Sequence, residues 1–133
     1  MLLSNAATES EITAAFATLV ERQARAVFVG AAAQLLPRYD QIISLAGSYA
    51  LPTMFAYGGA ARQGGLLSYG YLLSEANRLM GAYTGRILKG EKPADVPVQQ
   101  ATRFEFVINL KTARAIKLEI PPLLLALADE VIE

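Results

Sequence analysis

The 133-residue chain contains no histidine, no cysteine and no tryptophan. Without histidine and cysteine it cannot form a disulfide, a zinc site of the usual kind, a cysteine nucleophile or a Ser-His-Asp relay. Charge is also scarce: 18% of the residues are charged, and 12 Lys and Arg balance 12 Asp and Glu. This balance gives no basic surface of the kind that binds nucleic acid. We therefore expect no nucleic-acid partner and no metal or cofactor.

Long apolar runs are absent as well, although 53% of the residues are hydrophobic. The longest runs, Ala26–Ala33 and Leu123–Ala128, are far shorter than the roughly 20 residues that cross a bilayer. The first five residues lack the basic and apolar regions of a signal peptide. The protein is thus expected to be cytoplasmic if Met1 is the native start. Carboxylates show no pairing, and Ser68 has no base at a recognisable spacing, so we do not expect an enzyme.

Helical and strand patterns alternate along the chain. Apolar residues at helical spacing predict helices over 10–24, 34–49, 72–89 and 110–116, with a last helical turn after Pro121-Pro122. Short β-branched or apolar runs predict strands over 26–30, 51–57, 66–70 and 103–109. Residues 8–11 are typical of a capping box, and Asn109 of a helix cap. This order predicts a single α/β domain over residues 1–133, a parallel sheet flanked by helices.

Four glycines fall within residues 58–65, which predicts a tight turn or a hinge. The loop has neither the G-x-G-x-x-G nor the G-x-x-x-x-G-K-[ST] pattern, so nucleotide binding is not favoured. Tyr57, Arg62, Tyr69 and Tyr71 surround it. Loops at the carboxyl ends of parallel strands bind ligands, where tyrosine can stack and arginine can clamp a carboxylate. Surface aromatics beside a solvated arginine are the simpler alternative, and composition alone favours it.

The chain resembles a known family over four separated blocks, residues 64–70, 87–98, 104–113 and 128–133. These blocks are similar to the C-terminal portion of ABC transporter substrate-binding proteins of the tryptophan and tyrosine transport type. The resemblance implies a type I periplasmic-binding-protein-like fold, in which two α/β lobes close on a small solute. This chain would then be the C-terminal half, and the family's location implies a periplasmic protein.

The resemblance also implies solute contacts around residues 65–70, where the chain returns across the cleft. The six residues expected to contact or frame the solute are Tyr57, Arg62, Gly65, Ser68, Tyr69 and Gly70. The chain departs from the family in the residues before Gly64, at Tyr71-Leu72 in place of Pro-Asp, and at Lys117, where the family favours glycine. If Lys117 is left-handed, it costs about 1 kcal/mol.

Two functions follow from these observations. In the first, the chain is the solute-binding component of an ABC transporter, or a fragment of one. It would bind a small molecule such as an amino acid and, when full-length, dock on the transporter permease. In the second, it is a truncated relic or interaction domain that oligomerises without a solute. Half of a two-lobed protein leaves apolar surface and strand edges uncovered, so we expect a homodimer or higher oligomer. Gly81 and Gly85, a G-x-x-x-G pair, predict close packing of the long helix on a sheet or a partner.

Overall fold

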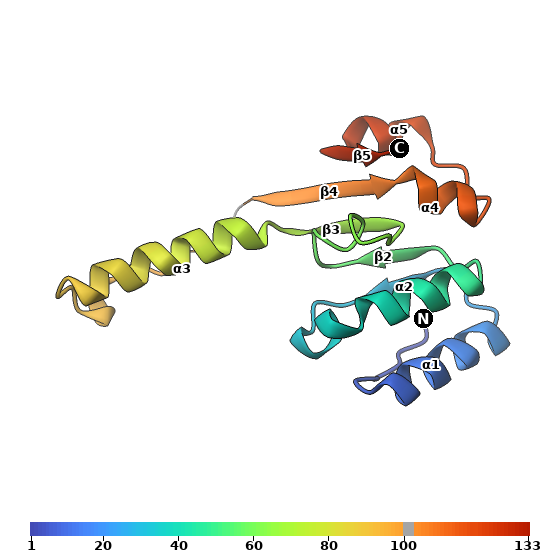
Figure 1. Ribbon diagram of the computed structural model, residues 1–133, viewed down its shortest axis with the longest axis horizontal. Helices are drawn as coiled ribbons and strands as arrows, with labels where there is room; N and C mark the ends of the chain where they lie inside the picture. The colour runs from blue at the N-terminus through green and yellow to red at the C-terminus, as the bar shows by residue number, and fades with distance from the viewer. Residues whose placement is uncertain (100–102) are drawn as a thin grey trace.

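The computed structural model describes residues 1–99 and 103–133. The chain forms a five-stranded sheet in the order β1-β2-β3-β4-β5, with helices around it (Figure 1). The strands are β1 (Val27–Val29), β2 (Thr53–Phe55), β3 (Leu67–Tyr71), β4 (Phe104–Asn109) and β5 (Glu130–Ile132). The helices are α1 (Glu9–Glu21), α2 (Tyr39–Ser48), α3 (Leu73–Leu88), α4 (Leu110–Ala115) and α5 (Pro122–Leu127), with 3-10 helices η1 (Ala33–Arg38) and η2 (Pro93–Asp95). The predicted α/β class is confirmed.

The strand directions are mixed. β1, β2 and β3 run parallel, β4 is antiparallel to β3, and β5 is parallel to β4. The β3–β4 pair differs from the parallel arrangement expected from the alternating pattern. The reason is that α3 leads away from the end of β3 instead of crossing back over the sheet, so β4 starts at the edge where β3 ends (Figure 1). β5 has no counterpart among the predicted elements, because its residues lie between acidic side chains and are not part of a longer apolar run such as those that predicted β1 and β2.

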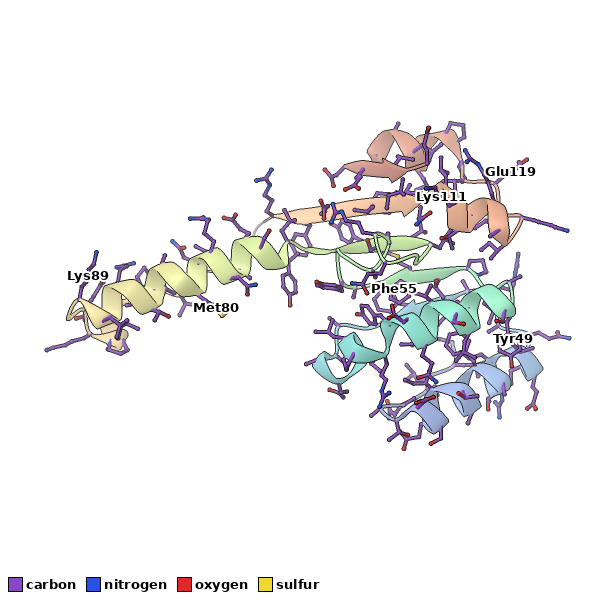
Figure 2. The ribbon with its side chains drawn as sticks, in the orientation of Figure 1. Tyr49, Phe55, Met80, Lys89, Lys111 and Glu119 are labelled. Carbon is purple, nitrogen blue, oxygen red and sulfur yellow. The ribbon has the colours of Figure 1, made fainter. Side chains whose placement is uncertain are left out.

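The core lies between α1, α2 and one face of the sheet (Figure 1). Ile12 and Phe16 of α1 and Ile42 and Ala46 of α2 are buried, which confirms the apolar spacing of both helices. They pack with Phe55, which is labelled in Figure 2 and is fully buried at the end of β2. This packing fixes where α2 and the segment after β2 lie.

Local signals in the sequence set several element boundaries. The predicted capping box at α1 is present: the Thr8 hydroxyl accepts from the Glu11 backbone N–H, and the Glu11 carboxylate accepts from the Thr8 N–H. The pKa of Glu11 is lowered most by the hydrogen bond that its carboxylate accepts from the Ala7 backbone N–H, and further by those from Thr8. Asn109 caps α4 as predicted, by accepting from the Thr112 N–H at 3.1 Å. The predicted helix over 34–49 is instead η1 followed by α2, because Pro37 lies within η1.

Helix α3 projects from the sheet as an arm (Figure 1). None of its described side chains is buried, and Met80 and Leu88 are 59% and 82% exposed. A Cβ added at Gly81 or Gly85 would meet nothing within 4 Å. The expected packing of this helix on the sheet therefore does not occur within the described chain. No helix in the described residues is long and apolar enough to cross a membrane.

Lys117 ends α4 in a left-handed conformation, with φ of 56°. A side chain at such a φ is strained, and glycine is not. We expect Lys117→Gly to raise the free energy of unfolding by about 0.5–1 kcal/mol, measured by chemical denaturation. Lys111→Gly is the matched control: it lies within the helical backbone of α4, so it should destabilise by about 1 kcal/mol. Equal effects of the two substitutions would contradict the strain at Lys117.

Candidate functional site

The carboxyl ends of β1, β2 and β3 meet at one edge of the sheet, together with the start of β4. Ligands bind open α/β sheets at this kind of edge, because the loops that follow the strands surround a common space. In this chain, α3 leaves from the same edge (Figure 1). The residues that follow the strands there are the candidates for a binding site.

Tyrosines gather near this edge. Tyr39 starts α2, Tyr57 follows β2 and Tyr71 ends β3. The Tyr39 ring lies edge-on to Phe55, with centroids 5.1 Å apart, and 5.9 Å from the Tyr57 ring. Burial raises the pKa of Tyr39, and the nearby Tyr57 and Tyr71 hydroxyls raise it further. We call Tyr39 and Tyr57, whose rings are in contact, the tyrosine cluster. Tyr71 lies two residues after Tyr69 in β3 and is therefore on the same face of that strand as Tyr69.

Sequence reasoning singled out Tyr57 and Tyr71 but missed Tyr39. Tyr39 follows Pro37 and Arg38 at a helix start, and nothing in its sequence position connects it with Tyr57. The two residues meet only because α2 packs across β2. The available signal was its position in the first turn of the helix after β1. Residues there lie near the carboxyl end of that strand, where α/β sheets bind ligands.

The glycine-rich loop is held in place by side chains from three elements. Ser68 of β3 donates its hydroxyl to the Gly58 carbonyl at 3.0 Å. Asn109 donates its amide to the Ala61 carbonyl at 2.9 Å, and Thr112 donates its hydroxyl to the Gly64 carbonyl at 2.8 Å. Ala60 and Ala61 are fully buried within the loop. The loop is therefore a packed turn, as one of the two sequence-based expectations had it.

Arg62 joins this loop to the two strands at the other end of the sheet. Its guanidinium donates to both carboxylate oxygens of Glu105 in β4, at 2.9 and 2.6 Å. It also donates to the Glu130 carboxylate in β5, through Nε at 3.0 Å and through Nη2. The hydrogen bonds that Arg62 donates to Glu105, and then those to Glu130, raise the pKa of Arg62 above its ordinary value. The Arg62 guanidinium is therefore paired with carboxylates of its own chain.

The structure separates the other predicted site residues. Ser68 and Gly70 are buried on the face of β3 that carries the glycine-rich loop, and Gly65 is buried within that loop. Tyr69 points to the opposite face, because successive residues of a strand alternate, and it is 49% exposed. Its ring stacks on Phe104 with centroids 5.7 Å apart. Tyr57 and Tyr69 thus do not share one pocket, and direct solute contact by any of the six residues stays a prediction.

Apolar side chains remain uncovered on the sheet face that bears Tyr69. Phe28, Tyr69 and Phe104 are 67%, 49% and 51% exposed there. A shallow hollow on this face is lined by Met54, Tyr69, Phe104, Phe106, Leu127 and Asp129. We call this the aromatic face. At the sheet edge, β1 has no second neighbour among the described strands, and a groove of about 530 Å³ with mainly apolar lining runs between β1 and α1.

Comparisons with known proteins extend this description. The sequence model of the family described as "ABC transporter substrate binding protein" matches residues 3–132. No functionally curated protein shows significant similarity to the chain. Among solved structures, a conserved domain protein from Vibrio cholerae is 21% identical with a TM-score of 0.85. The match covers 95% of this chain and 42% of the Vibrio cholerae chain. An ABC domain from Streptococcus pneumoniae in complex with L-Trp is 26% identical with a TM-score of 0.78, covering 93% of this chain and 41% of its own.

A third structure, the ligand-free open form of a Clostridium difficile substrate-binding protein with adhesive properties, is 21% identical with a TM-score of 0.57. It covers 86% of this chain and 39% of its own. The chain thus spans about two fifths of the length of each of these solved structures. The similarity confirms the expected periplasmic-binding-protein-like fold over nearly the whole chain.

Proposed function

Because the chain belongs to the ABC transporter substrate-binding protein family, we propose that it supplies one side of a cleft that binds a small solute. The observation that supports this most is the tyrosine cluster near the carboxyl edge of the parallel strands, where α/β sheets of this kind bind ligands. In this proposal, Tyr57 contacts the solute with its ring. Ser68, Gly65, Gly70 and Arg62 hold the adjoining loop in shape.

An amino acid with an aromatic side chain is the proposed solute class. The Streptococcus pneumoniae domain, solved with L-Trp, supports this choice. The chemistry of the edge supports it too, since tyrosine rings offer flat apolar surfaces together with hydroxyl groups. Because Arg62 is engaged by Glu105 and Glu130, the proposed contact is aromatic and polar, and a carboxylate clamp by this arginine is not part of it.

We propose that residues 1–133 form a single α/β domain equivalent to the C-terminal half of a two-lobed protein. The share of the Vibrio cholerae and Streptococcus pneumoniae chains that it covers, 42% and 41%, supports this assignment. A transporter permease as partner and a periplasmic location follow from the family and belong to the same proposal.

The solute is tested by thermal unfolding of the purified chain with increasing L-Trp. A ligand present at 100 times its Kd adds about 2.7 kcal/mol to the stability of the native state, so above Kd the melting temperature should keep rising with the logarithm of the ligand concentration. Tyr57→Ala should abolish most of that rise. Tyr49→Ala is the matched control, because Tyr49 is 42% exposed at the far end of α2 (Figure 2).

If neither L-Trp nor any other common amino acid raises the melting temperature of the wild-type chain, the second function is supported instead. That function is a truncated relic or interaction domain that binds no solute. The internal engagement of Ser68 and Arg62 is the observation in its favour, because their polar groups already have partners within the chain.

In either case, we propose a second copy of this chain as the partner that covers the exposed apolar surfaces. The 16 residues of α3 make an arm about 24 Å long. The five strands, at about 4.8 Å spacing, give the aromatic face a width of about 20 Å. An arm of one copy is therefore long enough to cross the aromatic face of the other. Reciprocal exchange would cover both surfaces in both copies.

A further inference from the structure

The hydroxyl group of Tyr39 is buried without a hydrogen-bond partner among the described residues. The whole side chain is 1% exposed. Buried hydroxyl groups are nearly always hydrogen-bonded, because loss of their contact with water is otherwise uncompensated. Phenylalanine would fill the same space without that cost. The hydroxyl therefore destabilises the chain as it stands, which calls for a reason outside the packing of the core.

The surroundings of Tyr39 connect its ring with the candidate site. Phe55 packs edge-on against the Tyr39 ring, and Tyr57 lies beside it. Tyr57 itself lies close to Gly59, where an added Cβ would come within 2.9 Å of the Tyr57 ring carbon Cε1. Among the described residues, no hydrogen bond holds the Tyr57 hydroxyl. The Tyr57 ring can thus turn away from Tyr39 without breaking one.

The charges near Tyr39 restrict what could pair with it. The groups that act on its hydroxyl are the phenols of Tyr57 and Tyr71. Arg62 is bound by Glu105 and Glu130, so its charge is already matched. A desolvated position without a countercharge favours an uncharged polar group over an ion. The N–H of an indole or the O–H of a phenol has that character.

We propose that the Tyr39 oxygen accepts a hydrogen bond from the ring N–H or O–H of an aromatic solute, and that Tyr57 moves aside to stack against the same ring. This inference rests on the proposed function and names the residue that selects among aromatic solutes. A site built to bond a polar atom discriminates strongly against an analogue that lacks it, whereas an apolar pocket does not. The wild-type chain should therefore prefer L-tryptophan to L-phenylalanine.

The test compares the wild-type protein with Tyr39→Phe, using L-tryptophan and L-phenylalanine as probes in calorimetric titrations. We expect the wild-type preference for L-tryptophan to fall at least about tenfold in Tyr39→Phe, with the affinity for L-phenylalanine unchanged. Tyr49→Phe, the control, should keep the preference. The melting temperature without ligand supplies a second readout, and Tyr39→Phe should leave it unchanged or raise it.

Each other outcome counts against a defined claim. If the wild type binds neither amino acid, the proposed function fails and this inference with it. If the wild type binds L-tryptophan but Tyr39→Phe keeps the full preference, only the role of Tyr39 fails. A lower melting temperature of ligand-free Tyr39→Phe also overturns the inference, because it would mean that the hydroxyl already has a structural partner, such as a buried water.

Discussion

Gly70→Ala is expected to lower the free energy of unfolding by about 2–3 kcal/mol. A Cβ at this position would lie 2.5 Å from the carbonyl oxygen of Ala56 and 3.1 Å from the backbone nitrogen of Gly58. Both atoms belong to the backbone, so no side chain can rotate to relieve the contact. The segment after β2 or the strand β3 would have to move, and the Ser68 to Gly58 hydrogen bond lies in the same place.

Chemical denaturation of the wild type and the variant measures this loss. Gly47→Ala is the matched control, because it lies in α2, where an added Cβ would meet nothing within 4 Å. This control should be neutral or stabilising by up to about 1 kcal/mol. A Gly70→Ala protein as stable as the control would show that β3 and the segment after β2 can separate without cost. The loop would then not be the packed turn described above.

Met80→Asp in α3 is expected to convert the proposed dimer into a monomer. Met80 is 59% exposed in one chain and lies on the same side of the helix as Leu79 and Tyr83. In the proposed exchange, this side rests on the aromatic face of the other copy. A carboxylate placed there would be buried without a partner at a cost of several kcal/mol, which should disrupt the interface.

Light scattering coupled to size-exclusion chromatography, at several protein concentrations, reports the mass of wild type and variant. Ala82→Asp adds the same charge to the same helix on an exposed position away from the apolar side, so its mass should match that of the wild type. A wild-type chain that is monomeric at every concentration would defeat the second-copy proposal. Equal dissociation by both variants would instead point to a general charge effect.

The amino-acid sequence by itself determined the elements whose signals are local. The capping box before α1 and the Asn109 cap of α4 each depend on residues three positions apart, and both are present. Apolar residues at helical spacing predicted the regions that contain α1, α2 and α3, and short apolar runs predicted the regions that contain β1, β2, β3 and β4. The left-handed position of Lys117, raised from the family comparison, is likewise a property of one helix end.

Only the tertiary structure decided how these elements meet. Arg62 pairs with Glu105 and Glu130, which are 43 and 68 residues away in the sequence, and no local pattern signals such a pair. Whether α3 crosses back over the sheet or leads away from it decides the direction of β4, and the helical pattern is the same in both cases. Tyr39 reaches Tyr57 because α2 packs across β2. Contacts between distant residues depend on the balance of packing over the whole domain, which the spacing of residues within one element does not contain.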